Sequence, residues 1–485
     1  MIEIKNVGFS YENSLSGETL KDIDIIIPSG QAVILCGGSG SGKTTFGRLI
    51  NGLIPCYYEG TLTGSVNIDG TDTSKIHLHK LAKKVGSVFQ NPKSQFYTML
   101  TDTEIVFACE NMGMDKGEIL RRFEKNVREF HLEKLLGKSV SELSGGEKQR
   151  IACASVSMLS PDMLVLDEPT SNLDVDSIRE LRDIILKWKN AGKTVIIAEH
   201  RLWWAKSFAD RVIRFDDGRI AEDISAELFY SRSAEELHSA GLRCGCDLMP
   251  IRKPSEAAQS CCTISSFVYT RKGFVLDIPE IKIPKGSVVA VIGNNGAGKS
   301  TFARCVCGLE RKFRICVSDG EKEYRGRKLT GFSYIVFQDV NHQLFSESVL
   351  EDVTLGLPLS DNEKMRTAEK VLKSMELFEY KDAHPMSLSG GQKQRLAIAG
   401  AVAAEKKLII YDEPTSGLDY KNMCRTAENI LKLSEQGKTQ FIITHDPELI
   451  EKCCDRFLFF ENGKITDSGI WTESAVLKIR KYFSQ

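Results

Sequence analysis

The sequence has no excess of charge of either sign and no apolar run long enough to cross a membrane. Its 485 residues include 64 Lys and Arg against 65 Asp and Glu, a formal net charge of −1. No basic block or stripe stands out, so nothing indicates nucleic-acid binding. No apolar run approaches the roughly 18 residues of a membrane-spanning helix. The first residues, MIEIKNVGFS, lack the basic and apolar regions of a signal peptide. We therefore expect a soluble chain that reaches a membrane only through partners.

The cysteines match neither a disulfide framework nor a zinc site. Of the 14 in the chain, several lie inside apolar patterns, such as Cys36, Cys153 and Cys305. Buried, reduced thiols are the simplest interpretation. A mixed, polar and aperiodic segment contains Cys244, Cys246, Cys261 and Cys262. Their spacing fits no standard zinc pattern, so ordinary thiols are favoured there, with a metal or iron–sulfur site as the less favoured alternative.

One set of motifs occurs twice, in the same order. GGSGSGKT is answered by GNNGAGKS, LSGGEKQR by LSGGQKQR, and LVLDEPTSNLD by IIYDEPTSGLD. The copies keep register, because the same interval separates Ser144 from Ser389 and His200 from His445. The repeat predicts two domains, each large enough for its own buried core. The boundaries we expect are a first domain at 1–228, a linker with room for one helix at 229–261, and a second domain at 262–485.

Short apolar runs alternate with helix-length amphipathic stretches in each copy. AVILCGG, DMLVLDE and TVIIAEH predict buried parallel strands, and SVVAVIG, KLIIYDE and TQFIITH repeat them. This is an α/β pattern, in which ligands bind beyond the carboxyl ends of the strands. The strands end at a glycine-rich loop, at an Asp-Glu pair and at a His, so we expect these groups to converge on one edge of the sheet.

The glycine-rich loops match G-x-x-x-x-G-K-[ST] between a strand and a helix, the context that makes this motif specific. Backbone N–H groups of the loop and the helix N-terminus bind phosphate oxygens. Lys43 and Lys299 should reach the β- and γ-phosphates of ATP, and Thr44 and Ser300 should bind Mg²⁺. The predicted ATP-binding residues of the loops are Gly37, Gly38, Ser39, Gly40, Ser41, Gly42, Lys43, Thr44 and Thr45, and Gly293, Asn294, Asn295, Gly296, Ala297, Gly298, Lys299, Ser300 and Thr301.

An Asp-Glu pair ends a strand in each copy. Asp167 and Asp412 are predicted to hold Mg²⁺ through water, and Glu168 and Glu413 to polarise the attacking water. Phosphoryl transfer depends on positioning and electrostatics, and general-base help contributes on the order of 10²–10⁴-fold. An acidic pair that only caps a helix before proline would explain one isolated motif. Two copies, each with a glycine-rich loop upstream, favour catalysis.

The LSGG segments fit capping boxes at helix starts, Ser144-x-x-Glu147 and Ser389-x-x-Gln392. Capping does not explain the two glycines or the repeated KQR. These segments resemble the signature of ATP-binding cassette (ABC) ATPases, and the resemblance covers nearly the whole chain outside the linker. It implies an α/β fold of two tandem P-loop domains. Each would have a RecA-like, mainly parallel core sheet, an antiparallel β subdomain and a helical signature subdomain.

In that family the signature of one domain faces the P-loop of the other. The resemblance therefore pairs Lys43 and Glu168 with Ser389 and Gly391 in one site, and Lys299 and Glu413 with Ser144 and Gly146 in the other. Both sites have the full set of residues, so we expect both to hydrolyse ATP. The further positions that the resemblance assigns are signature Gly145 and Gly390, Q-loop Gln90 and Gln338 (also toward Mg²⁺), switch His200 and His445, D-loop Asp174 and Asp419, and adenine-stacking Tyr11 and Tyr269. For the tyrosines, a core position near a strand stays open.

Related segments follow the two Q-loop glutamines. The pattern FQNP-x-x-Q, followed by T-x-x-E-I-x-F-x-x-E-N, resembles the ATPases of energy-coupling factor (ECF) importers, as does the EHR at the first switch histidine. This resemblance implies that Gln95 and Gln343 of this chain belong to a short helix that touches the transmembrane scaffold. Thr101-x-x-Glu104 and Ser348-x-x-Glu351 each fit a capping box that opens the next helix.

The ECF resemblance implies an ATPase subunit at the cytoplasmic face of the cell membrane, with one chain supplying both ATPase domains. Its partners would be a transmembrane coupling protein and a small membrane substrate-binding protein. Together they would import a vitamin, a vitamin precursor or a transition-metal ion.

Two alternatives remain. One is a fused importer ATPase of the sugar or peptide class, although fused sugar importers tend to have one degraded site. The other is a soluble twin-cassette ATPase acting in translation. The D-loops of such proteins typically contain NHLD, whereas this chain has SNLD and SGLD.

Overall fold

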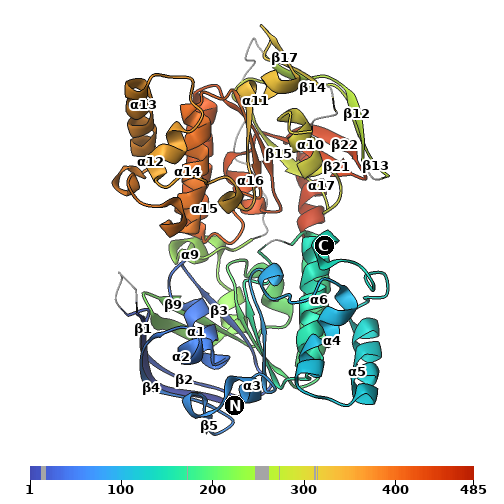
Figure 1. Ribbon diagram of the computed structural model, residues 1–485, viewed down its shortest axis with the longest axis vertical. Coiled ribbons are helices and arrows are strands. Elements are labelled where there is room, and N and C mark those ends of the chain that lie inside the picture. Colours follow the sequence, from blue (N-terminus) through green and yellow to red (C-terminus); the bar gives the residue numbers. More distant parts are fainter. Residues whose placement is uncertain are drawn as a thin grey trace. The chain divides into compact units, whose positions relative to one another are not determined.

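The computed structural model describes residues 1–12, 18–171, 173–245, 261–271, 273–310, 313 and 315–484 (Figure 1). Its contacts divide the chain into two compact units, Met1–Gly245 and Cys246–Gln485. Within the described ranges, no helix combines the length and the apolar character needed to cross a bilayer.

The first unit contains two sheets. A four-stranded antiparallel sheet has the order β2-β1-β4-β5, and a six-stranded sheet has the order β10-β9-β3-β8-β7-β6. From β9 to β6 all pairs are parallel, and β10 is added antiparallel at one edge. The strands are β1 Ile2–Tyr11, β2 Leu20–Ile27, β3 Ala32–Gly37, β4 Gly60–Ile68, β5 Thr71–Asp72, β6 Val85–Val88, β7 Met163–Asp167, β8 Thr194–Ala198, β9 Arg211–Asp216 and β10 Arg219–Ser225.

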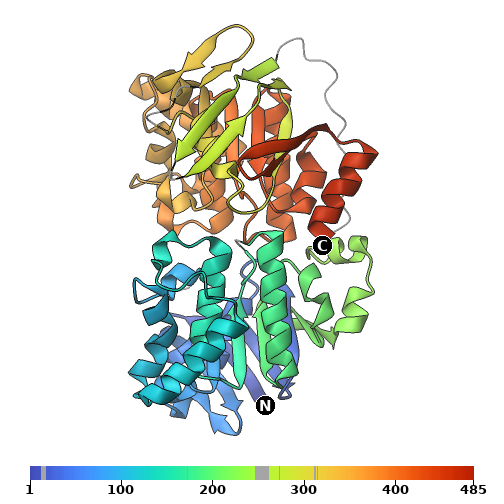
Figure 2. The ribbon, with the colours of Figure 1, turned by 90° about the vertical axis from the view of Figure 1, so that its right-hand side faces the viewer.

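Helices cover the core sheet of the first unit. In Figure 2 the cyan α4 and α5 lie on the side of this unit away from the green α8 and α9. The helices are α1 Lys43–Ile50, α2 Leu53–Cys56, α3 Leu78–Leu81, α4 Thr101–Asn111, α5 Lys116–Glu129, α6 Gly145–Ser157, α7 Val175–Asn190, α8 Ala226–Tyr230 and α9 Ala234–Ser239.

Strand β3 is buried on both faces. Ala32, Ile34 and Cys36 belong to a core cluster with the helices, whereas Val33 and Leu35 belong to a second cluster with the antiparallel sheet. A strand covered on both faces needs apolar residues at every position, which explains the unbroken run AVILCG. Because the last residue of this strand is Gly37, the core fixes where the glycine-rich loop begins.

The second unit repeats this plan with a larger sheet. Its antiparallel sheet has the order β14-β11-β16-β17, and its core sheet the order β12-β13-β22-β21-β15-β20-β19-β18, parallel from β21 to β18. The strands are β11 Cys261–Ile264, β12 Phe267–Arg271, β13 Phe274–Ile278, β14 Ile281–Pro284, β15 Val288–Ile292, β16 Cys316–Ser318, β17 Glu323–Arg325, β18 Ser333–Val336, β19 Leu408–Asp412, β20 Thr439–Ile443, β21 Arg456–Glu461 and β22 Lys464–Ile470. The helices are α10 Lys299–Val306, α11 Leu329–Phe332, α12 Val349–Thr354, α13 Asp361–Ser374, α14 Gly390–Ala403, α15 Tyr420–Glu435, α16 Pro447–Cys453 and α17 Glu473–Ser484. The α/β class and the division into two similar domains are confirmed.

The segment expected to be a linker begins as part of the first unit. Leu237 in α9 and Leu242 beyond it are buried in the helical core cluster, and the Tyr230 hydroxyl donates to the Leu202 carbonyl at 2.8 Å. The structure therefore divides the chain after Gly245 rather than after Leu228, because these apolar contacts hold residues 229–245 on the core. Of the cysteines considered for a metal site, Cys244 has its Sγ 3.1 Å from His238 Nε2. Cys261 and Cys262 are free thiols, and Cys246 lies outside the described residues.

A buried carboxylate connects the second unit's antiparallel sheet to its core. Asp319, between β16 and β17, is 2% exposed. It accepts hydrogen bonds from Lys407 Nζ at 2.8 Å, from the Tyr324 hydroxyl at 3.1 Å and from the N–H groups of Glu321 and Lys322. Burial alone would raise the pKa of Asp319, but these donors hold it well below its usual range.

We expect Asp319→Asn to weaken this region by about 2 kcal/mol at pH 7, because a charged acceptor is lost. The measurement is amide hydrogen exchange in β16 and β17. Since the folded-state pKa lies below the unfolded value of about 3.9, the difference from the parent should shrink as the pH falls below about 4. Glu323→Gln, an exposed neighbour, is the control and should change little. Equal exchange in the parent and Asp319→Asn at pH 7 would contradict this assignment.

Candidate functional site

Each glycine-rich loop leads from the central core strand into a helix. Gly37 has a φ of 140°, and a Cβ there would lie 2.3 Å from the Phe215 carbonyl oxygen; Gly293, with a φ of 146°, would clash with Phe460 in the same way. Only glycine fits at this first position of the loop. The two loops therefore begin with the same conformation for the same steric reason.

The P-loop lysines fold back over their own loops. Lys43, 5% exposed, donates from Nζ to the carbonyl oxygens of Gly37 at 2.9 Å and Gly38 at 2.8 Å. Lys299 donates to the corresponding carbonyls of Gly293 and Asn294. A buried ammonium held at the centre of a glycine-rich loop is placed to bind phosphate oxygens.

The residues predicted to hold Mg²⁺ lie side by side. Thr44 Oγ1 donates to Asp167 Oδ1 at 2.9 Å. Burial, reinforced by the charge of Glu168, raises the pKa of Asp167 to about 6. In the second unit burial raises the pKa of Asp412, and a hydrogen bond from Ser300 opposes the rise. Hydroxyl and carboxylate oxygens suit Mg²⁺, and a cation would stabilise the ionised form of these carboxylates. The residues therefore fit the metal.

In the first unit Glu168, the predicted base, lies between the predicted Q-loop glutamine and the predicted switch histidine. Gln90 Nε2 donates to Glu168 Oε2 at 2.7 Å, and His200 Nε2 lies 3.4 Å from Glu168 Oε1. Glu168 has a φ of 41°, a left-handed conformation that costs a non-glycine residue about 1–3 kcal/mol. Its N–H group donates to the Ala198 carbonyl at 2.8 Å. The Asp-Glu turn is therefore fastened to strand β8, which leads to the switch histidine.

The second unit repeats the left-handed glutamate and the histidine beside it. Glu413 has a φ of 50° and donates its N–H to the Ile443 carbonyl at 2.9 Å. His445 Nε2 lies 3.6 Å from Glu413 Oε1. Gln338 follows β18 as Gln90 follows β6. The roles of all these residues in catalysis and binding stay predictions.

The signature and D-loop residues begin long helices. Ser144 caps α6 and Ser389 caps α14, and both form the reciprocal capping boxes that the sequence predicts. Asp174 and Asp419 cap α7 and α15 by accepting N–H groups of the first helical turn. The pairing of each signature with the other domain's P-loop stays an implication of the family resemblance.

The two tyrosines predicted to stack on adenine are anchored differently. Tyr11 OH lies 3.1 Å from Thr45 Oγ1 and accepts from Arg48 at 2.9 Å, and Arg48 lies 4.1 Å from the ring centre of Tyr58. Tyr269 OH instead donates to Glu310 at 2.8 Å. Nothing in the sequence pattern marks which side chain meets a tyrosine, so only the fold reveals these partners. Adenine stacking stays a prediction.

The side chains of Gln95 and Gln343 form hydrogen bonds with backbone groups of nearby residues in the same unit. Each amide accepts from the N–H of the residue before the Q-loop glutamine, Phe89 or Phe337, and donates to a strand carbonyl. Each follows a short 3₁₀ helix, Pro92–Ser94 or Val340–His342. Their amides thus hold the Q-loop in place within each unit.

The capping box predicted at Thr101 is wrong. Leu100 is the N-cap of α4, and Thr101 Oγ1 donates instead to the Leu135 carbonyl at 2.8 Å. Glu104 accepts from the N–H groups of Tyr97 and Thr98 at 3.0 and 2.7 Å. The helix starts one residue earlier than the pattern indicates, so the glutamate turns toward the preceding loop.

In the second unit Ser348 does cap α12, by accepting from the Glu351 N–H. Asp352, rather than Glu351, accepts from the N–H groups of Phe345 and Ser346 at 3.0 and 3.1 Å. Asp352 is thus the counterpart of Glu104. In both units a carboxylate on the following helix fixes the loop that leaves the Q-loop segment.

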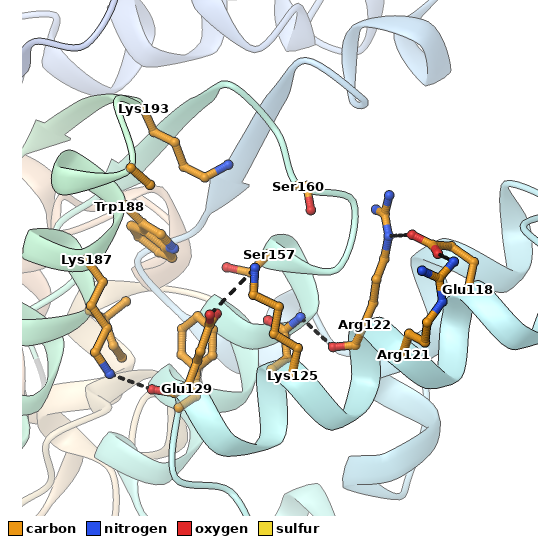
Figure 3. Close-up of a pocket in the computed structure, with 14 residues that line it drawn as sticks. Glu118, Arg121, Arg122, Lys125, Glu129, Ser157, Ser160, Lys187, Trp188 and Lys193 are labelled. Carbon is orange, nitrogen blue, oxygen red and sulfur yellow. Dashed lines mark hydrogen bonds and ion pairs between the residues drawn. The ribbon is translucent and has the colours of Figure 1, made fainter.

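A cavity of about 550 Å³ lies apart from these groups, between α5, α7 and the end of α6 (Figure 3). No P-loop residue lines it. Its charges are mostly paired: Arg121 and Arg122 with Glu118, and Lys125 with Glu129 at 3.6 Å. It is therefore not a candidate nucleotide site.

Comparisons with known proteins agree with this geometry. The family model described as "ABC transporter" matches residues 20–171 and 276–416. A "Putative ABC transporter ATP-binding protein" of Treponema denticola is 42% identical, with 96% of each chain covered. A protein of the same name from Methanosarcina mazei is 31% identical over 97% of this chain and 89% of its own length.

Among solved structures, one reported as "Model of ribosome-bound archaeal Pelota and ABCE1" has a TM-score of 0.66 at 21% identity, covering 94% of this chain and 77% of that chain. At this identity the likeness shows the fold alone. Taken with the two sets of motifs, these matches show that the chain belongs to the ABC transporter ATPase family, as two tandem cassettes in one polypeptide.

Proposed function

We propose that this chain hydrolyses ATP at two sites, each completed by both cassettes, and that it thereby drives an ECF-type membrane importer. The observation that carries the ATPase proposal is the same set of groups in both units. Each has a P-loop lysine, a hydroxyl beside an aspartate, and a left-handed glutamate within 3.6 Å of a histidine. Such positioning is what phosphoryl transfer requires.

ATP with Mg²⁺ would supply a γ-phosphoryl group whose charge is partly neutralised. Lys43 binds the phosphates, and Thr44 and Asp167 would hold the metal, whose charge would offset that of the phosphate oxygens. Glu168 orients and polarises the attacking water, and Gln90, which donates to it, keeps its carboxylate turned toward the site. The second unit's equivalents do the same work there.

Closure and reopening follow from shared ATP binding. A nucleotide held by the P-loop of one cassette and the signature serine of the other, Ser389 or Ser144, joins the two. The signature helices present capped N-termini, which favour anions. Loss of the γ-phosphate removes those contacts and releases the cassettes.

We expect Glu168→Gln/Glu413→Gln to lower the ATPase kcat by about 10²–10⁴-fold, because the general base is lost while the phosphate ligands remain. Binding of ATP should persist. Phosphate release and ATP retention on gel filtration measure the two effects. Glu180→Gln/Glu428→Gln, which changes exposed glutamates on α7 and α15, is the matched control. Hydrolysis by the first variant at the parent rate would mean that neither glutamate is the base.

Coupling to a membrane partner is supported by exposed apolar side chains after the Q-loops. Tyr97 and Met99 are 79% and 78% exposed, and Phe345 is 75% exposed. The loops that carry them are fastened by Glu104 and Asp352. Exposed apolar residues that lie together are a feature of interaction sites. The relatives' names as ABC transporter proteins support a membrane partner, and the sequence pattern around the Q-loops supports an ECF coupling protein.

We expect Tyr97→Asp/Phe345→Asp to weaken partner binding by about 30-fold, the loss typical of a hot-spot residue, with ATP hydrolysis by the isolated chain kept. Leu477→Asp, at an exposed apolar position on α17, is the control. The measurement is recovery of membrane proteins from detergent-solubilised native membranes, using the Glu168→Gln/Glu413→Gln background with Mg-ATP. We expect to recover a polytopic membrane protein together with a small membrane protein. Equal recovery by both surface variants would contradict docking at these loops.

The alternative is a twin-cassette ATPase acting in translation. The fold likeness to the ABCE1 structure at 21% identity is compatible with it but indicates fold only. The D-loop sequences SNLD and SGLD speak against it. Recovery of ribosomes without membrane proteins in the same experiment would favour it.

A further inference from the structure

A buried carboxylate joins the catalytic turn of the first unit to its switch turn. Thr170 lies two residues after Glu168 in the DEPT sequence. Its hydroxyl donates to Glu199 Oε2 at 2.6 Å. The other oxygen, Oε1, accepts from the N–H groups of His200 and Arg201 at 2.7 and 3.1 Å. Thr170 is fully buried and Glu199 is 2% exposed. One carboxylate thus binds the turn of the predicted base and the turn of the switch histidine.

The second unit makes the same connection with a different residue. Thr415 is the counterpart of Thr170, and its hydroxyl donates to Asp446 Oδ2 at 2.5 Å. Asp446 Oδ1 accepts from the N–H groups of Glu448 and Leu449, at the start of α16. Its own N–H donates to Thr444 Oγ1 at 3.0 Å. Thr415, Thr444 and Asp446 are all fully buried.

The two carboxylates come from opposite sides of the histidine. The first copy has Glu-His-Arg and the second Thr-His-Asp, so Glu199 precedes its histidine and Asp446 follows its own. The threonine hydroxyl thus binds a glutamate that precedes the histidine in one unit and a shorter aspartate that follows the histidine in the other. Helix capping explains only part of Asp446's bonds and none of Glu199's. What the copies share is the carboxylate on the threonine hydroxyl.

This contact has a mechanical consequence for the predicted base. Glu168 and Glu413 are held in a left-handed conformation, which the surrounding structure must maintain. On the amino side, their N–H groups bind strand carbonyls. On the carboxyl side, the threonine two residues later binds the buried carboxylate. The turn is therefore clamped from both sides, and the second clamp includes the backbone beside the histidine.

We propose that Glu199 and Asp446, each with its threonine, are positioning residues: they lock the turn of the catalytic glutamate to the turn of the switch histidine. This inference rests on the proposed hydrolysis of ATP. It assigns no contact with nucleotide to either carboxylate. The clamp sets the distance between glutamate and histidine, and rate depends steeply on such distances.

The test removes only the threonine hydroxyls in the full chain. Thr170→Val/Thr415→Val keeps the side-chain shape, and Thr170→Ser/Thr415→Ser keeps the hydroxyl and loses the methyl groups. We expect the Val variant to lose on the order of tenfold in kcat, with the KM for ATP within about twofold, because the base is misplaced while the phosphate ligands stay. The Ser variant should recover most of the rate.

Thermal unfolding of both variants separates positioning from stability. A Val variant that is folded, less stable than the parent and equal to it in kcat would overturn the proposal, as would equal losses in the Val and Ser variants. If the double variant does not fold, the single variants Thr170→Val and Thr415→Val still test the proposal. The kcat of each should be lower than that of the matching single Ser variant. The parent rate distinguishes the two ideas. A parent without Mg-dependent hydrolysis contradicts the proposed function, whereas an active parent matched by its Val variant contradicts only the clamp.

Discussion

Both candidate sites depend on the register of three neighbouring parallel strands. In the first unit Leu35 of β3 lies opposite Ala198 of β8, and Ala198 also lies opposite Asp167 of β7. In the second unit Val291 and Asp412 lie opposite Ile443 of β20 in the same way. Because parallel strands end at the same edge, this register brings the P-loop, the Asp-Glu pair and the histidine together. A shift of one residue would turn the side chains to the opposite face and disperse the site.

The burial of these strands is what keeps the register. In the first unit their residues pack into two apolar clusters, one on each side of the sheet. A strand that shifted along its neighbours would expose apolar side chains to water, which costs free energy. The polar groups of the site begin where the strands end. Chemistry that requires a left-handed glutamate next to a buried aspartate is thus supported by a core that contributes no functional group.

The two copies reach similar geometries by different local means. Tyr11 is anchored by Arg48 and Tyr269 by Glu310. Glu104 and Asp352 fasten equivalent loops from side chains of different length, and Glu199 and Asp446 do so from opposite sides of a histidine. The last two replacements keep a carboxylate oxygen at one place while the residue that supplies it changes. They are therefore better evidence of a geometric requirement than an identical residue at equivalent positions of the two copies.

The sequence alone determined the fold class, the repeat and the members of the motifs, because buried strands, glycine-rich turns and capped helices have short-range signatures. The capping boxes at Ser144 and Ser389 form as predicted, since both partners lie within one helical turn. The tertiary structure decided the rest. Thr101 fits the same pattern but is turned to the Leu135 carbonyl by contacts from another segment. Likewise, Glu199 meets Thr170 only because two strands end side by side, a relation that no spacing along the chain can express.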